Sequence, residues 1–171
     1  MKTLGKVFVA GTLLAASSAL LVVPQFAVSA SQDMGGMHHA GNPDDPTPAF
    51  HLEPPKDSLP ETLEPSIYAE NIEVFNAYTV AGRVKKVLYQ EPCYCHCDRS
   101  QGHGSLLDCF VSRHGSGCDI CMKEAFYSYE QTRKGKTPAQ IREGILRGDW
   151  QKVDTVKYSK AFLPPRNSPA K

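Results

Sequence analysis

Hydrophobic residues in the middle of the chain recur every three to four positions, which is the spacing of one helix face. The first such stretch follows Ser66, whose hydroxyl can cap a helix, and it predicts a helix over residues 66–81. Its expected core-facing positions are Ile67, Val74, Phe75 and Tyr78. Gly82 can end or bend this helix, and a further turn or two is predicted before Pro92.

Three later stretches also predict helices. Ser105 can cap a short helix that Gly115 closes, and a longer helix is predicted over residues 120–134. The clearest start signal is Thr137-Pro138-Ala139-Gln140, which has the residue order of a capping box. The residues expected to face the core in these helices are Leu106, Leu107, Phe110, Val111, Met122, Phe126, Tyr129, Ile141 and Ile145.

The pattern as a whole predicts an all-α fold. No stretch alternates between hydrophobic and polar residues as a strand would, and there is no internal repeat. We expect a small helical domain of about four helices over residues 66–150, organised around a Cys-rich loop cluster. Prolines and polar residues dominate residues 31–65, which predicts a disordered Pro-rich tether, and residues 151–171 are expected to form a C-terminal tail.

Residues 1–30 are typical of a secretory signal peptide. Lys2 and Lys6 precede a nearly charge-free apolar run, residues 7–23. Val28-Ser29-Ala30 then supplies small residues for cleavage. Cleavage after Ala30 predicts an exported protein, periplasmic or extracellular, without a stable membrane span. The alternative is a retained anchor, because the run is about as long as the shortest spanning helices.

The charge of the chain gives no reason to expect a nucleic acid partner. The sequence has 19 Lys and Arg residues against 18 Asp and Glu residues, and loss of the signal peptide's two lysines would leave 17 against 18. Such a chain lacks the positive charge that attracts DNA or RNA. The sequence identifies no protein partner either.

All six cysteines of the chain lie within residues 93–121, together with three histidines. They form a Cys-x-Cys-x-Cys run, a single Cys and a Cys-x-x-Cys pair. Thiolates and imidazoles are the ligands of soft and borderline metal ions. The candidate ligands are therefore Cys93, Cys95, Cys97, Cys109, Cys118, Cys121 and His103, with His96 and His114 as weaker candidates.

The metal expected at these residues is copper(I) or zinc. In an extended segment the thiols of Cys93, Cys95 and Cys97 would face one side, and a curve in the backbone would bring two or three of them onto one ion. Three close thiolates suit copper(I), whereas a closed set of four thiolates suits zinc. Further soft ligands of the kind copper prefers are present in Met34, Met37, His38 and His39, although a polar tail also explains that segment.

Two other functions are compatible with the same cysteines. Cys118-x-x-Cys121 has the spacing of thiol-disulfide redox proteins, and a helix starting near Asp119 would place Cys121 where the helix dipole favours thiolate. Alternatively, six cysteines in an exported chain can form three disulfides and staple a helical interaction scaffold. The sequence contains no Ser/His/Asp set, phosphate-binding glycine loop or paired carboxylates, which favours a non-enzymatic role.

The surroundings of the cysteines resemble a known family. The run Glu91-Pro92-Cys93-Tyr94-Cys95-His96-Cys97, with residues 102–110, residues 118–121 and Glu124, is similar to the PCYCGC-motif proteins, small exported bacterial proteins that are often lipoproteins and have no established activity. The resemblance covers residues 70–148 and implies that the six cysteines and His103 act as a unit. Two features depart from the family: His96 replaces the glycine of the motif, and the lipobox cysteine is absent, which suggests a soluble exported protein.

Overall fold

A computed structural model describes residues 46–164 and confirms the all-α class. All of these residues belong to one of two compact units of the chain, residues 34–171. The predicted signal peptide, the Met34, Met37, His38 and His39 segment and residues 165–171 lie outside the described residues.

The described part of the chain contains six α-helices, four 3₁₀ helices and no strand. The α-helices are α1 (Ile72–Arg83), α2 (Lys85–Leu88), α3 (Cys97–Gln101), α4 (Asp108–Val111), α5 (Asp119–Arg133) and α6 (Pro138–Leu146). The 3₁₀ helices are η1 (Pro65–Tyr68), η2 (His114–Gly117), η3 (Asp149–Lys152) and η4 (Val156–Tyr158).

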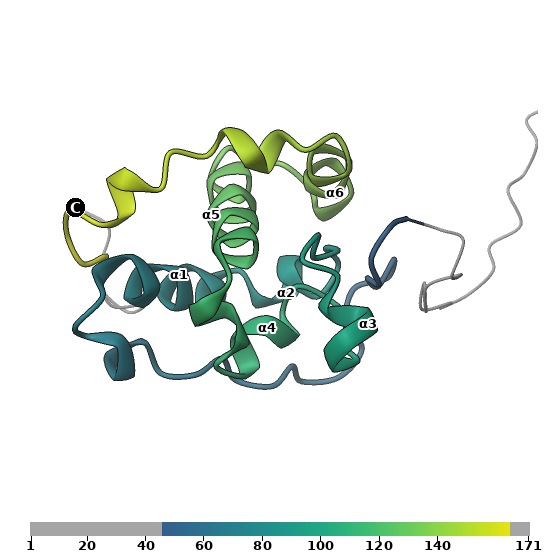
Figure 1. Ribbon diagram of the computed structural model, residues 1–171. Helices are drawn as coiled ribbons and strands as arrows, with labels where there is room; N and C mark the ends of the chain where they lie inside the picture. The colour runs from purple at the N-terminus through teal and green to yellow at the C-terminus, as the bar shows by residue number, and fades with distance from the viewer. Residues whose placement is uncertain (1–45, 165–171) are drawn as a thin grey trace, which may run out of the picture. The chain divides into compact units, whose positions relative to one another are not determined.

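The main core forms where α5 crosses α1, with α4 packed beside the crossing (Figure 1). The rings of Tyr78 and Phe110 meet edge to face at a centroid distance of 5.1 Å, and those of Phe126 and Tyr158 stack at 3.8 Å. Four of the six cysteines are buried in this same core. A smaller hydrophobic cluster between α5, α6 and η3 is formed by Tyr127, Ile141, Ile145 and Trp150.

The first α-helix starts later than the sequence predicts. Ser66 lies in η1 and caps nothing, whereas the side chain of Asn71 accepts a hydrogen bond from the Val74 amide at 3.2 Å and begins α1. Asn is at least as good an N-cap as Ser, and Asn71 directly precedes the first residue of α1. The predicted core position of Ile67 is wrong, because its side chain is 47% exposed, while Val74 and Tyr78 are buried as predicted.

The predicted cap at Ser105 is also wrong. The Ser105 hydroxyl is buried without a hydrogen-bond partner among the described residues, and α4 begins three residues later. The cause is tertiary, since the amides of Leu106 and Leu107 donate to the carbonyls of Glu91 (2.9 Å) and Leu88 (3.3 Å) instead of starting a helix. The short helix then ends before Ser112, ahead of the predicted stop at Gly115.

The two C-terminal α-helices confirm their predictions closely. α5 ends at Arg133, and Gly135 follows with a φ of +77°. At the start of α6, Thr137 and Gln140 form the complete capping box, and Ile141 and Ile145 are fully buried. No helix among the described residues is long and apolar enough to cross a membrane.

The packed part of the domain extends beyond the predicted residues 66–150 at both ends. On the N-terminal side, Phe50 is buried and the Leu63 amide donates to the Phe110 carbonyl at 2.9 Å. On the C-terminal side, the buried Asn76 amide group donates to the Tyr158 carbonyl at 2.6 Å and accepts from the Leu163 amide at 2.7 Å. These contacts hold described parts of both flanking segments against the helices.

Replacing Thr137 with alanine should lower the free energy of unfolding by about 1 kcal/mol, because the Gln140 amide loses its side-chain acceptor. Urea denaturation followed by circular dichroism would measure the change. Thr137→Ser is the matched control and should retain most of the stability, since its hydroxyl can accept the same bond. Equal losses in the two variants would contradict a role for the cap.

Candidate metal centre

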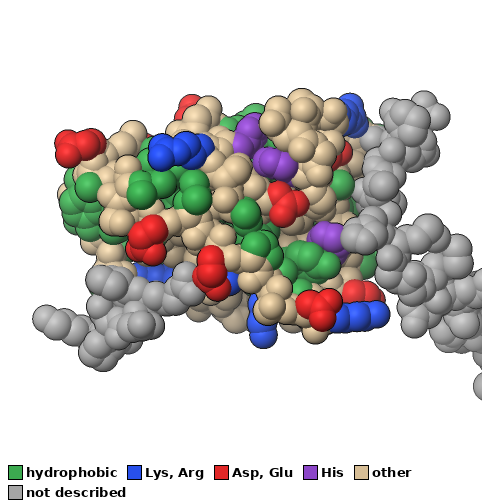
Figure 2. Space-filling model, turned by 90° about the horizontal axis from the view of Figure 1, so that it is seen from below, with side chains coloured by type: hydrophobic (Ala, Val, Ile, Leu, Met, Phe, Trp, Pro, Cys, Tyr) green, Lys and Arg blue, Asp and Glu red, His purple; other side chains and the backbone are tan. Residues whose placement is uncertain are grey.

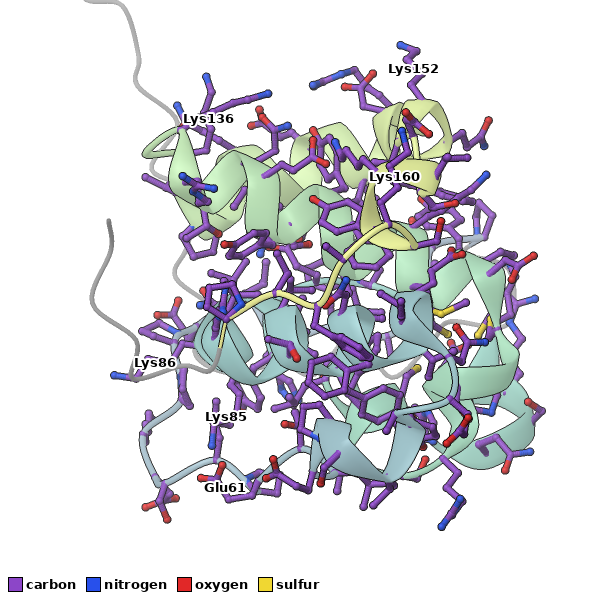
Figure 3. The ribbon with its side chains drawn as sticks, turned by 90° about the vertical axis from the view of Figure 1, so that its left-hand side faces the viewer. Glu61, Lys85, Lys86, Lys136, Lys152 and Lys160 are labelled. Atoms are coloured by element: carbon purple, nitrogen blue, oxygen red, sulfur yellow. The ribbon has the colours of Figure 1, made fainter. Side chains whose placement is uncertain are left out.

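The six cysteine side chains converge from three separate parts of the chain. Cys93 and Cys95 lie in the loop leading into α3 and Cys97 is the first residue of α3, whereas Cys109 lies in α4 and Cys118 and Cys121 lie at the start of α5. Figure 3 shows the sulfur atoms gathered on one side of the molecule, away from the labelled Lys85 and Lys86. The fold thus assembles into one place thiols that are up to 28 positions apart.

A turn brings the first three thiols together. The His96 amide donates to the Cys93 carbonyl at 3.1 Å, and His96 has a φ of +55°, so the segment is curved where the sequence suggested an extended stretch. The Tyr94 amide donates to Oε1 of Glu124 at 2.9 Å, which ties this loop to α5. As a result the Sγ atoms of Cys93 and Cys95 lie 3.5 Å apart.

The remaining sulfur contacts link the loop to α4 and α5. Sγ of Cys93 lies 3.4 Å from that of Cys121, and Sγ of Cys97 lies 3.4 Å from that of Cys109. All six cysteines are free thiols. The distances are longer than the ~2.05 Å of a disulfide bond. They are close to the ~3.8 Å edge of a tetrahedron of thiolates bound at about 2.3 Å around zinc.

Two imidazoles border the thiols. Nδ1 of His103 lies 3.1 Å from Sγ of Cys97 and 3.4 Å from Sγ of Cys109, and the amide of the neighbouring Gly104 donates to Asp108, which fixes the loop. Nε2 of His114 lies 3.5 Å from Sγ of Cys95. The sequence made His114 a weaker candidate, but its distance to a thiol is similar to the distances between neighbouring sulfur atoms.

His96 does not face the thiols in the same way. Its ring meets Tyr94 edge to face at a centroid distance of 6.0 Å, and its buried Nδ1 has no hydrogen-bond partner in the described part of the chain. The left-handed backbone at this position explains the difference, because it turns residue 96 out of line with its cysteine neighbours. Glycine, the residue of the PCYCGC motif, adopts this conformation without strain.

The ligand atoms form two groups that can each hold a metal ion. Within each group all ligand atoms lie within 4.8 Å of one another. The first group consists of Cys93, Cys95, Cys97 and Cys109, and the second of Cys95, Cys109, His114 and Cys121. Cys118 is in neither group, but its thiol interacts with those of Cys121 and Cys95 and accepts a hydrogen bond from the Cys121 amide at 3.5 Å.

The cluster has a buried side and a solvent-facing side. Cys93, Cys97, Cys109 and Cys121 are buried, whereas Cys95, Cys118, His103 and His114 are partly exposed. The rings of His103 and His114 lie 5.1 Å apart, and Nε2 of His114 lies 3.5 Å from Sγ of the partly exposed Cys95. Figure 2 shows histidine side chains at the surface of the molecule. The partly exposed ligands give an ion access to the thiols without unfolding of the core.

Neighbouring thiols change one another's affinity for protons. Hydrogen bonds from the thiols of Cys109 and Cys118 lower the pKa of Cys95. Hydrogen bonds with Cys109 and Cys121 raise the pKa of Cys93, because its thiol acts as the donor. Since thiolates are the metal-binding form, the contacts favour ionisation of some thiols over others.

Two glutamates are buried in the domain, and one of them, Glu124, is bonded to the cysteine loop. Glu124 is fully buried, and burial raises its pKa well above the usual range, which favours the neutral carboxyl, while Oε1 accepts a hydrogen bond from the Tyr94 amide. Sequence reasoning assigned no role to Glu124. A signal was present, because Glu124 lies three residues after Cys121 and thus on the same face of α5.

The second buried carboxyl is Glu91. Burial raises its pKa to about 9, with Arg142 opposing and Glu124 adding to the rise. Neither carboxyl oxygen has a hydrogen-bond partner among the described residues. Glu91 is therefore protonated in the folded chain at neutral pH, whereas it is ionised in the unfolded chain.

Replacing Glu91 with glutamine should stabilise the metal-free, reduced protein at pH 8 by on the order of 1–3 kcal/mol. The folded pKa lies above the unfolded one, so the carboxyl's contribution to stability is complete below about pH 4.5 and is lost as pH rises towards 9. Urea denaturation at pH 5 and pH 8 would measure it. A gain at pH 5 as large as that at pH 8 would contradict this account.

A comparison with protein-family models identifies the family of this chain. The model described as "Protein of unknown function with PCYCGC motif" matches residues 33–169. The chain belongs to this family. Within this PCYCGC-motif protein the family motif falls on the turn that carries Cys93, Cys95 and Cys97, and the match extends past the resemblance at residues 70–148. The comparisons with curated proteins and with solved structures gave no match.

Proposed function

We propose that this PCYCGC-motif protein is an exported, non-enzymatic metal-binding protein that holds copper(I) or zinc in its cysteine cluster. The observation that carries the proposal is the convergence of five thiols and the His114 imidazole into two groups, within each of which all ligand atoms lie within 4.8 Å of one another. Buried thiols resist ionisation in an apolar core, and a bound cation offsets that cost. A shared metal ion would therefore explain why this many thiols are packed together.

The ligand chemistry supports a soft or borderline metal. Thiolates select copper(I) and zinc, whereas magnesium and calcium prefer oxygen ligands. Burial raises the pKa of the buried Glu124 carboxyl well above its usual range, and its Oε1 already accepts from the Tyr94 amide, which disfavours this group as a charged oxygen ligand.

Export supports the same proposal. The signal-like residues 1–30 would send the chain to an oxidising compartment, where unprotected thiols pair as disulfides. A bound metal would protect them, because a coordinated thiolate is less available for oxidation. Metal binding and disulfide formation therefore compete for the same six side chains.

Native mass spectrometry of the protein from an exporting host, purified without reductant or chelator, tests this function. The expected mass includes a stoichiometric metal, and removal of the metal should make six thiols reactive towards a thiol reagent. A metal-free protein that has lost two hydrogens for each of three disulfides would overturn the proposal and favour the stapled scaffold.

A thiol-disulfide redox protein is the second candidate, supported by one feature of α5. Cys118 is partly exposed at the N-cap while Cys121 is buried one turn further on, as expected for an attacking and a resolving thiol. However, although Cys121 lowers the pKa of Cys118, the neighbouring Cys95 thiol and burial give a net rise, which disfavours the nucleophilic thiolate. Unchanged disulfide-reductase activity in a Cys118→Ser variant, with Cys95→Ser as the matched control, would exclude this candidate.

A further inference from the structure

The cluster offers more ligand atoms than one four-coordinate ion uses. The two groups of four share Cys95 and Cys109 and differ in their other members. Cys93 and Cys97 belong only to the first group, and Cys121 and His114 only to the second. One ion in either group would leave the other group's own ligands without a metal.

We propose that the cluster holds two metal ions side by side and that the thiolates of Cys95 and Cys109 are ligands of both. This inference rests on the proposed metal-binding function and sets its stoichiometry. Cys93 and Cys97 complete the first site, and Cys121 and His114 complete the second. A thiolate sulfur has more than one lone pair, so it can bind two soft ions at once.

The position of Cys121 argues for the second ion. Its thiol is fully buried and lies 3.4 Å from Sγ of Cys93 and 3.6 Å from Sγ of Cys95. With an ion in the first group alone, this thiol would stay buried against two thiolates. A second ion bound by Cys121 and Cys95 would replace the contact between these two thiolates with coordination to the same cation.

The charge of the cluster points the same way. One divalent ion bound by the four thiolates of the first group leaves two negative charges in the core, which is costly in a medium of low dielectric. A second divalent ion adds two positive charges and binds one further thiolate, Cys121, and one neutral imidazole, His114. The net charge then falls from −2 to −1, so the second ion stabilises the first.

Two further ligand candidates, His103 and Cys118, lie beside different groups. His103 contacts Cys97 and Cys109 of the first site, and Cys118 interacts with Cys121 of the second. Both are partly exposed. They are placed to donate hydrogen bonds to bound thiolates, which orients metal ligands and tunes their strength.

Zinc titration of the full, reduced, metal-free chain, followed by native mass spectrometry, tests the inference. The unmodified protein should bind two zinc ions. Cys97→Ser and His114→Ala should each retain one tightly bound ion, whereas Cys95→Ser should weaken both by at least tenfold. His96→Asn is the matched control, since Asn tolerates the left-handed backbone there, and it should retain two ions.

The outcomes separate this inference from the function on which it rests. Saturation of the unmodified protein by one zinc ion would overturn the two-ion inference and leave metal binding intact. No tight zinc or copper(I) binding by the folded chain would overturn both. X-ray absorption adds a readout that survives a folding defect in Cys95→Ser: a metal neighbour should be seen in the unmodified protein and be absent in His114→Ala, and its absence from both would overturn the inference.

Discussion

If the cysteine cluster holds a metal as proposed, removing that metal under reducing conditions is expected to lower the melting temperature of the protein by roughly 15 °C. Four of the ligands lie inside the main core, where they join the loop before α3 to α4 and α5. A ligand present at a thousand times its dissociation constant stabilises a fold by about 4 kcal/mol. The described residues 46–164 lie between the size classes of small and medium domains, for which each kcal/mol corresponds to about 4 °C.

The measurement is a thermal melt of the same sample with and without a strong chelator, with a reductant in both to prevent disulfides from replacing the metal. Cys109→Ser is the control, because Cys109 belongs to both ligand groups and its loss should remove most of the chelator's effect. Identical melts of the unmodified protein with and without chelator would show that the metal does not stabilise the fold.

Local signals in the sequence predicted the C-terminal helices well and the first helix less well. The capping box at Thr137 and the glycine after α5 act within a single turn, so their outcome depends little on the rest of the molecule. Ser66 failed as the cap of the first helix because the Asn71 side chain, further along the chain, caps α1 through the Val74 amide. Ser105 failed as a cap because distant carbonyls in Glu91 and Leu88 take the amides that would begin the helix.

The candidate site was predictable in its residues but not in its arrangement. The confinement of all six cysteines to residues 93–121 identified the cluster without a structure. The sequence could not show that His114 approaches Cys95, because residues 19 positions apart meet only through tertiary packing. It also could not show the left-handed turn at residue 96, where the ring of His96 faces Tyr94. It also could not show that Cys95 and Cys109 are common to two ligand groups, because that sharing arises only when α4 meets the loop before α3.

Replacing Glu124 with alanine is expected to weaken metal binding by about 10–100-fold, the usual cost of losing a side chain that orients metal ligands. The same change should lower the free energy of unfolding by about 1–3 kcal/mol, because a buried hydrogen bond is lost. The reason lies in one contact: Oε1 of Glu124 accepts the amide of Tyr94, which sits between Cys93 and Cys95. Without it the turn is no longer fixed to the helix that carries Cys121.

Glu124→Gln is the matched variant that isolates this contact. Burial raises the pKa of Glu124 well above its usual range, which favours the neutral carboxyl, and an amide of the same shape can still accept from the Tyr94 amide. Competition with a chromophoric chelator and urea denaturation should therefore show nearly normal metal affinity and stability for Gln, against large losses for Ala. If Gln loses as much affinity as Ala, the carboxyl acts on the metal through its charge, and its role as a support for the cysteine turn is refuted.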